Sequence, residues 1–184
     1  NNLPVLIAMT SIVLMYSLDI IFARRFFSPL NAGEFAFISL IGKVIFFVSM
    51  AIGKALLPIS TEGFTKGKET YKIFKKSVFL VACISLIALL LYYSYPELII
   101  KLISLGSEEY LGASNLLFEV GLAYTFLSIS NIIVLYRISI NKIKREAYYL
   151  LIFPVIQIIL FFIYNNNLLE FTLALLISNA LLFL

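Results

Sequence analysis

Six long apolar stretches constrain the fold of this chain more than any other feature of its sequence. They span about residues 3–23, 34–60, 77–95, 111–136, 147–164 and 168–184. A helix of about 20 apolar residues crosses the hydrocarbon core of a bilayer. Unpaired backbone groups are too costly in lipid, and the alternating pattern of a closed β-barrel is absent, so each stretch is expected to be a helix. The sequence therefore predicts an all-α integral membrane protein, built as a single bundle of six transmembrane helices.

The composition favours a membrane protein and excludes several kinds of chemistry. Hydrophobic residues make up 62% of the chain and charged residues 13%, which a soluble domain cannot usually accommodate. The chain has no histidine and a single cysteine, Cys83, which excludes imidazole catalysis, a Cys/His zinc site and an intrachain disulfide. No P-loop, Asp-rich metal motif or nucleophile beside a base is visible. We therefore expect no enzyme activity, no metal and no cofactor.

The basic residues of the loops predict the orientation of the chain. Two loops, 61–76 and 137–146, are strongly basic; their basic residues are Lys66, Lys68, Lys72, Lys75, Lys76, Arg137, Lys142, Lys144 and Arg145. Loops rich in Lys and Arg stay in the cytoplasm. We expect a multi-pass protein of the cell membrane, with the chain start and both basic loops in the cytoplasm. Loop 61–76 is expected to face anionic lipid headgroups and not a nucleic acid.

Two lysines lie inside the second apolar stretch, Lys43 and Lys54, and each follows a glycine. Eleven residues separate them, which places them on nearly the same side of a helix and about 16 Å apart along it. The glycines allow a neighbouring helix to approach closely. An ammonium in hydrocarbon is costly, so Lys43 is expected to project into a hydrated cavity and bind an anionic cargo; a structural ion pair is the alternative. Lys54 lies near the cytoplasmic end, where it either serves the cavity or reaches the interface.

Four further charged residues are candidates for the site. Asp19 is expected to pair with Lys43 or Arg24, or else to bind Na⁺ or a proton. Arg24 and Arg25 fall at the outer end of the first stretch, where they either recognise a phosphate or sugar-acid group or anchor to lipid phosphates. Glu119 lies in the fourth stretch; it is either a functional carboxylate or a protonated group hydrogen-bonded between helices.

Several uncharged features also carry predictions. Residues 28–33 are expected to form a turn, Pro96 to end the third helix, and segment 97–105 to lie at the membrane interface. The amides Asn131, Gln157 and Asn179 are expected to join helices. Tyr16, Tyr124 and Tyr136 either line a sugar path or anchor at the interface.

Several short motifs resemble those of a known family. Asp-Ile-Ile-Phe-Ala-Arg at 19–24, Ala-Gly-Glu-Phe at 32–35 and a Gly42-Lys43 helix ending Ala-Leu-Leu-Pro at 55–58 resemble the start of the second half of polysaccharide flippases. Pro-Glu-Leu-Ile-Ile at 96–100, Leu-Gly-Ser-Glu-Glu-Tyr at 105–110 and the basic loop after the fourth stretch are similar to theirs too. These flippases belong to the multidrug/oligosaccharidyl-lipid/polysaccharide exporter superfamily. The similarity covers nearly the whole chain.

The resemblance implies a transporter of two six-helix lobes that alternates access around a central cationic cavity. Its substrate would be a polyprenyl-pyrophosphate-linked glycan, moved to the outer leaflet. The chain would be the second, C-terminal lobe, and the N-terminal lobe and membrane lipids its other partners. It begins without methionine and ends within an apolar stretch, so we expect a fragment of a longer protein. By motif, the cavity residues would be Arg24 and Lys43, with Asp19 beside them; Arg25, Lys54 and Glu119 have no motif support.

Two other functions stay open. The first is a cation-coupled drug or metabolite antiporter of the same superfamily, with Asp19 or Glu119 as its ion site. The second is a membrane-embedded glycan polymerase or transferase, for which Glu108-Glu109 is the available acidic cluster.

Overall fold

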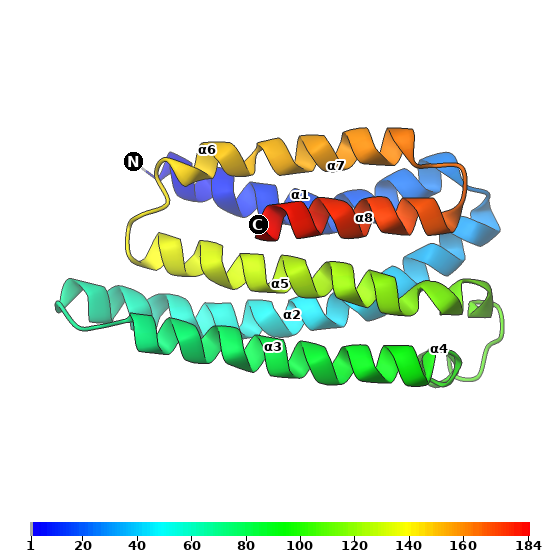
Figure 1. Ribbon diagram of the computed structural model, residues 1–184, viewed down its shortest axis with the longest axis horizontal. Helices are drawn as coiled ribbons and strands as arrows, with labels where there is room; N and C mark the ends of the chain where they lie inside the picture. The colour runs from blue at the N-terminus through cyan, green and yellow to red at the C-terminus, as the bar shows by residue number, and fades with distance from the viewer. Residues whose placement is uncertain (1) are drawn as a thin grey trace.

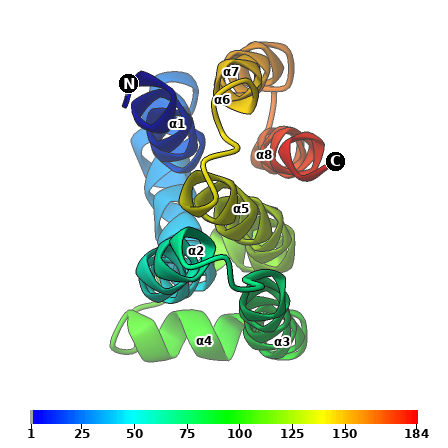
Figure 2. The ribbon, with the colours of Figure 1, turned by 90° about the vertical axis from the view of Figure 1, so that its left-hand side faces the viewer.

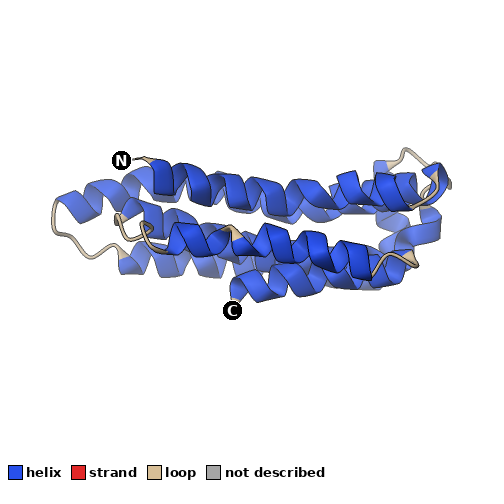
Figure 3. Cartoon of the chain, turned by 90° about the horizontal axis from the view of Figure 1, so that it is seen from above, coloured by secondary structure: helices blue, strands red, loops and turns tan. Residues whose placement is uncertain are grey.

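The computed structural model describes residues 2–184, which form helices joined by short connections and contain no strand (Figures 1 and 3). The helices are α1 (Leu3–Phe26), α2 (Pro29–Thr65), α3 (Tyr71–Ser94), α4 (Pro96–Ile103), the 3₁₀ helix η1 (Leu111–Leu116), α5 (Leu117–Ser139), α6 (Glu146–Leu150), α7 (Ile152–Ile163) and α8 (Leu168–Phe183). The predicted all-helical fold is confirmed for this part of the chain.

Five helical segments are long and apolar enough to cross a membrane. They are Leu3–Phe26, Pro29–Thr65, Tyr71–Ser94, Leu111–Ser139 and Glu146–Ile163. Helix α8 is apolar too, but its 16 residues are fewer than a bilayer-spanning helix usually has. The fold is thus compatible with a membrane-embedded helical bundle, while the count of six spans stays a prediction.

Helix α2 is longer at both ends than the apolar pattern indicates. It begins at Pro29 because Pro fits the first helical position and because the Ser28 side chain accepts a hydrogen bond from the Asn31 N–H, at 3.4 Å. Most of the turn expected at 28–33 is therefore helical. At its other end α2 continues past Pro58 to Thr65, and only residues 66–70 separate it from α3. Its 37 residues make a helix of about 56 Å, longer than the hydrocarbon core is thick.

The fifth apolar stretch is divided into α6 and α7. Pro154 has no backbone N–H to donate to the carbonyl of Leu150, and its ring crowds the preceding turn. The helix accordingly breaks at Leu151 and resumes at Ile152. The fourth stretch starts as the 3₁₀ helix η1 and becomes α-helical at Leu117.

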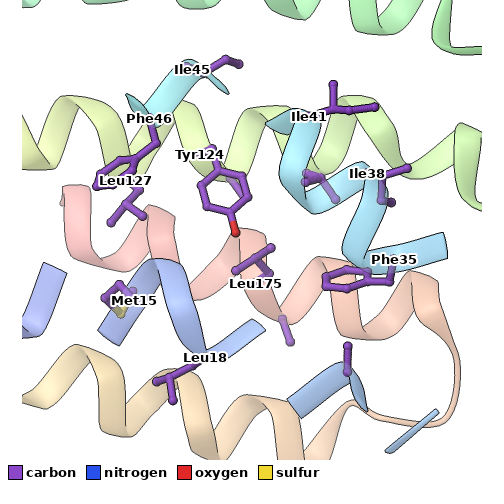
Figure 4. Close-up of a cluster of buried hydrophobic side chains, with 14 of the residues drawn as sticks. Met15, Leu18, Phe35, Ile38, Ile41, Ile45, Phe46, Tyr124, Leu127 and Leu175 are labelled. Atoms are coloured by element: carbon purple, nitrogen blue, oxygen red, sulfur yellow. The ribbon is translucent and has the colours of Figure 1, made fainter. Parts of the chain in front are cut away.

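Helix α5 lies at the centre of the bundle. It packs against α1, α2, α3 and α8, and Figure 2 shows it among the surrounding helices. Its side chains at Leu117, Ala123, Tyr124 and Leu127 are fully buried. Around them lies one core, drawn in part in Figure 4, to which α1, α2 and α8 also contribute. Side chains of α1 and α2 that contact α5 therefore lie inside the bundle, away from its outer surface.

The connections rich in Lys and the remaining connections lie at opposite ends of the bundle. The α2–α3 and α5–α6 connections lie at the same end as the start of the chain (Figure 1). Most of the loop expected at 61–76 is helical: Lys66 and Lys68 lie in the connection 66–70, whereas Lys72, Lys75 and Lys76 lie in the first turns of α3. The α1–α2 and α7–α8 connections and α4 lie at the other end. This distribution accords with one basic face, although which compartment it meets stays a prediction.

Candidate functional site

The carboxylate of Asp19 is the centre of a buried polar cluster. Asp19 lies on α1 and is 0% exposed. The ammonium of Lys43 donates to its Oδ1 at 3.0 Å. The hydroxyl of Tyr124 donates to its Oδ2 at 2.6 Å, and the hydroxyl of Ser39 donates to the same oxygen. The cluster therefore joins three helices, α1, α2 and α5.

Local sequence explains how two of these partners meet Asp19. Ser39 and Lys43 are four residues apart on α2, so they lie one above the other on the same face. Only Phe27 and Ser28 separate α1 from α2, which makes the two helices antiparallel neighbours. Asp19 lies eight residues before Phe27 and Ser39 eleven residues after Ser28, so these two lie at similar levels. Lys43 is one turn further along α2, and its long side chain reaches back toward the start of that helix to Asp19. Of the two arrangements considered for Lys43, the ion pair with Asp19 is the one present.

The third partner depends on a glycine. A Cβ at Gly42 would lie 2.7 Å from Cγ1 of Val120 and 2.9 Å from Cδ2 of Tyr124. The absence of a side chain there lets the Tyr124 ring rest on α2 with its hydroxyl directed away from α5 into the core (Figure 4). Gly53 likewise accommodates the side chain of Leu135. The prediction that the two glycines permit close helix approach is confirmed.

The electrostatics of the cluster follow from its burial. A charge removed from water is costly, and an ion pair offsets that cost only when further hydrogen bonds satisfy the remaining lone pairs. Asp19 meets this condition, because both carboxylate oxygens accept bonds. Lys43 is 5% exposed, and its Nζ lies 5.6 Å from the centroid of the Tyr124 ring, which adds a cation–π contact. The positive charge of Lys43 is thus balanced within the bundle, and its role as a ligand for cargo stays a prediction.

The other predicted basic residues lie apart from this cluster. Lys54 is exposed, although helical spacing places it on nearly the same side of α2 as the buried Lys43. Arg24 and Arg25 are exposed in the last turn of α1. Arg24 lines a pocket of about 390 Å³ between the end of α1 and the start of α2, together with Phe27 and Gly33.

Glu119 is not part of the Asp19 cluster. It lies five residues before Tyr124 on α5, which directs it to a different side of that helix. Its side chain is half-buried, and its Oε2 is fully buried without a hydrogen-bond partner among the described residues. The structure thus places Glu119 in the first turn of α5 as a second carboxylate, separate from Asp19.

The buried amides serve mainly to join helices. Gln157 Nε2 donates to the carbonyl of Met15 at 3.2 Å, and Asn131 Nδ2 to the hydroxyl of Ser49 at 3.5 Å. These bonds confirm the prediction for two of the three amides. The third, Asn179, is fully buried, and neither its amide nitrogen nor its oxygen has a partner within residues 2–184.

Sequence reasoning missed Ser39 and misjudged Tyr124. The spacing of Ser39 and Lys43 is a signal for the first, since a hydroxyl one turn from an intramembrane charge is well placed to share its counter-ion. No local signal identifies Tyr124, which is 105 residues from Asp19 in the chain. Within the described residues, no three His, Cys, Asp or Glu side chains gather as a metal site requires.

Comparisons with protein families, with curated proteins and with solved structures found no match to this chain. The resemblance to polysaccharide flippases therefore depends on the short motifs quoted above and stays a prediction.

Proposed function

We propose that this chain forms one lobe of a transporter that flips a polyprenyl-pyrophosphate-linked glycan across the cell membrane by alternating access. The observation that carries the proposal is the position of Arg24, an exposed guanidinium lining a pocket beside the start of α2. Five membrane-length helices and the sequence motifs support it. The glycan would be recognised through its pyrophosphate.

Arg24 and the start of α2 have complementary properties for binding an anion. A guanidinium offers a planar fork of N–H donors that fits phosphate oxygens. The start of α2 is also the end of that helix at which its dipole is partially positive. Arg25 is the next residue and is also exposed, so it adds positive charge at the same end of α1.

The Asp19–Lys43 pair limits what Lys43 contributes in this conformation. Because Asp19 balances its charge, the first contact with a phosphate falls to Arg24 and Arg25. Lys43 becomes available to the cargo only when α1 moves relative to α2, so that Asp19 and Lys43 separate. In this scheme the pair holds α1 and α2 together until the cargo arrives.

Substitution of Arg24 in the full-length protein tests the proposal. Arg24→Ala is expected to reduce glycan export at least tenfold with normal expression, and Arg24→Lys to retain part of the activity because the charge remains. Lys72→Ala is the matched control, since Lys72 is an exposed cation in the first turn of α3, and α3 begins at the opposite end of the bundle from the α1–α2 connection (Figure 1). Normal export by Arg24→Ala would contradict the proposal.

A cation-coupled antiporter is the second candidate function. The observation that favours it is the buried, unpartnered Oε2 of Glu119, because a lone intramembrane carboxylate is suited to carry a proton or a cation. Efflux of a drug driven by a proton or Na⁺ gradient, and lost in Glu119→Gln, would support this function over glycan flipping.

A further inference from the structure

Helix α4 has two faces of different character. Ile100 is fully buried in the core, and Ile99 packs against it. Leu98 and Leu102, one turn apart on another face, are 60% and 73% exposed. Leu105, just past the end of the helix, is 96% exposed. Three largely exposed leucines therefore follow one another along α4 and the residues just after it.

Leu105 also has an unusual backbone conformation. Its φ is +56°, in the left-handed region that a side chain with a Cβ rarely adopts. The conformation closes a helix C-terminal motif, in which the Gly106 N–H donates to the carbonyl of Lys101 at 2.7 Å. Glycine usually occupies the left-handed position, but here it comes one residue later. Leu105 therefore has a strained backbone conformation, and its side chain points away from the protein surface.

The length of α3 indicates where these leucines lie relative to a bilayer. The 24 residues of α3 make a helix of about 36 Å, slightly more than the thickness of the hydrocarbon core. Helix α4 follows immediately and lies across the bundle, not along it (Figure 2). It therefore lies where a spanning helix leaves the bilayer.

The surface near α4 has the character of a membrane interface. Apolar side chains of α3 such as Leu86 and Leu90 are exposed over most of their area, and this surface continues to Tyr93 and Tyr95 at the end of the helix. Tyrosine is enriched at the boundary between lipid and water. On α4, the charged Glu97 and Lys101 lie one turn apart, and Lys101 pairs with Glu108 at 3.2 Å.

We propose that α4 lies in the membrane plane at the end of the bundle opposite the basic loops, with Leu98, Leu102 and Leu105 inserted among the lipid acyl chains. The charged side of α4 then faces the headgroups and water, which is the arrangement of an interfacial amphipathic helix. Contact with lipid stabilises the exposed Leu105 side chain and so offsets the strain of its backbone. The inference depends on membrane insertion but not on what the protein transports.

Tryptophan fluorescence tests this inference directly, because the chain contains no tryptophan. Leu105→Trp and Leu102→Trp are introduced separately into the full-length protein and reconstituted in phosphatidylcholine vesicles, and the emission of the parent protein is subtracted. Lipids brominated near the headgroup end of the chain are expected to quench both variants at least twofold. Iodide in the aqueous phase is expected to quench them little.

Two further positions calibrate the measurement. Leu90→Trp, at an exposed site within α3, is expected to be quenched most by lipids brominated deep in the chain. Phe64→Trp, near the end of α2 at the opposite end of the bundle, is expected to be quenched by iodide and not by brominated lipid. Quenching of both the 105 and 102 variants in the pattern of Phe64→Trp would overturn the inference.

Discussion

The Oδ1 atom of Asp19 on α1 and the Nζ atom of Lys43 on α2 form an ion pair of 3.0 Å, and both side chains are almost completely buried. The pair joins the two helices that precede and follow the first connection. Ser39 and Tyr124 complete the bonding of the carboxylate. The charge of Lys43, in the middle of an apolar stretch, thus has its counter-ion within the bundle.

Removing one member of the pair is expected to destabilise the protein strongly. Lys43→Met leaves the Asp19 carboxylate buried without its counter-ion, at a cost of about 3–5 kcal/mol. Asp19→Asn/Lys43→Met removes both charges and is expected to recover most of that loss. The midpoint of thermal unfolding in detergent micelles measures both effects.

The same double variant separates stability from transport. If Lys43 must release Asp19 to contact the cargo, Asp19→Asn/Lys43→Met is well folded but does not export glycan. A double variant that exports at the parental rate would show that the pair is structural only, and would remove Lys43 from the proposed mechanism.

Loss of the Tyr124 hydroxyl is expected to weaken the cluster without disturbing the packing of the ring. Tyr124→Phe removes a buried hydrogen bond to a charged group, with a cost of about 1.5–3 kcal/mol. Tyr136→Phe is the control, because the Tyr136 hydroxyl is 3.2 Å from the neutral hydroxyl of Thr70 in a less buried place. Thermal unfolding of the two variants compares these costs; equal shifts would argue against a charged Asp19.

A methyl group at Gly42 is expected to force α2 and α5 apart. Gly42→Ala places a Cβ within 2.9 Å of Val120 and Tyr124 side-chain atoms, and overpacking of this kind costs about 1–3 kcal/mol. Gly33→Ala on the same helix meets no atom within 4 Å and is expected to be neutral or slightly stabilising. Melting temperatures of the two variants provide the comparison, and a Gly42→Ala protein as stable as Gly33→Ala would show that the contact is looser than described.

Neutralising Glu119 is expected to leave the fold intact or to stabilise it. Glu119→Gln replaces a half-buried carboxylate, one oxygen of which has no partner, by an amide that is less costly to remove from water. An unchanged or higher unfolding midpoint supports this description, whereas a clearly lower midpoint would mean that the charge has a partner in the assembled protein. Under the antiporter alternative, the same variant also loses the dependence of efflux on the proton or Na⁺ gradient.

The sequence was most informative where short-range rules apply. Long apolar runs predicted the helices because backbone groups in lipid must be paired within each segment. The short connection after Phe26 and the charges at 19 and 43 made an Asp19–Lys43 pair one of the expected arrangements, beside an Asp19–Arg24 pair and a cavity role for Lys43. The apolar pattern was less exact about where helices end. The cap at Ser28 determines where α2 begins, and the pyrrolidine ring of Pro154 determines where α6 ends.

The tertiary structure alone decided which helix lies at the centre and which residues complete the site. The long helices are apolar on all sides, so no amphipathic face indicates which side meets another helix and which meets lipid. The position of α5, the contact of Tyr124 with Asp19 and the different environments of Lys43 and Lys54 all depend on packing between segments far apart in the chain. The sequence determined that charged groups had to be accommodated within apolar helices, and the packing of those helices determined that Asp19 and Lys43 are buried together while Arg24 remains exposed.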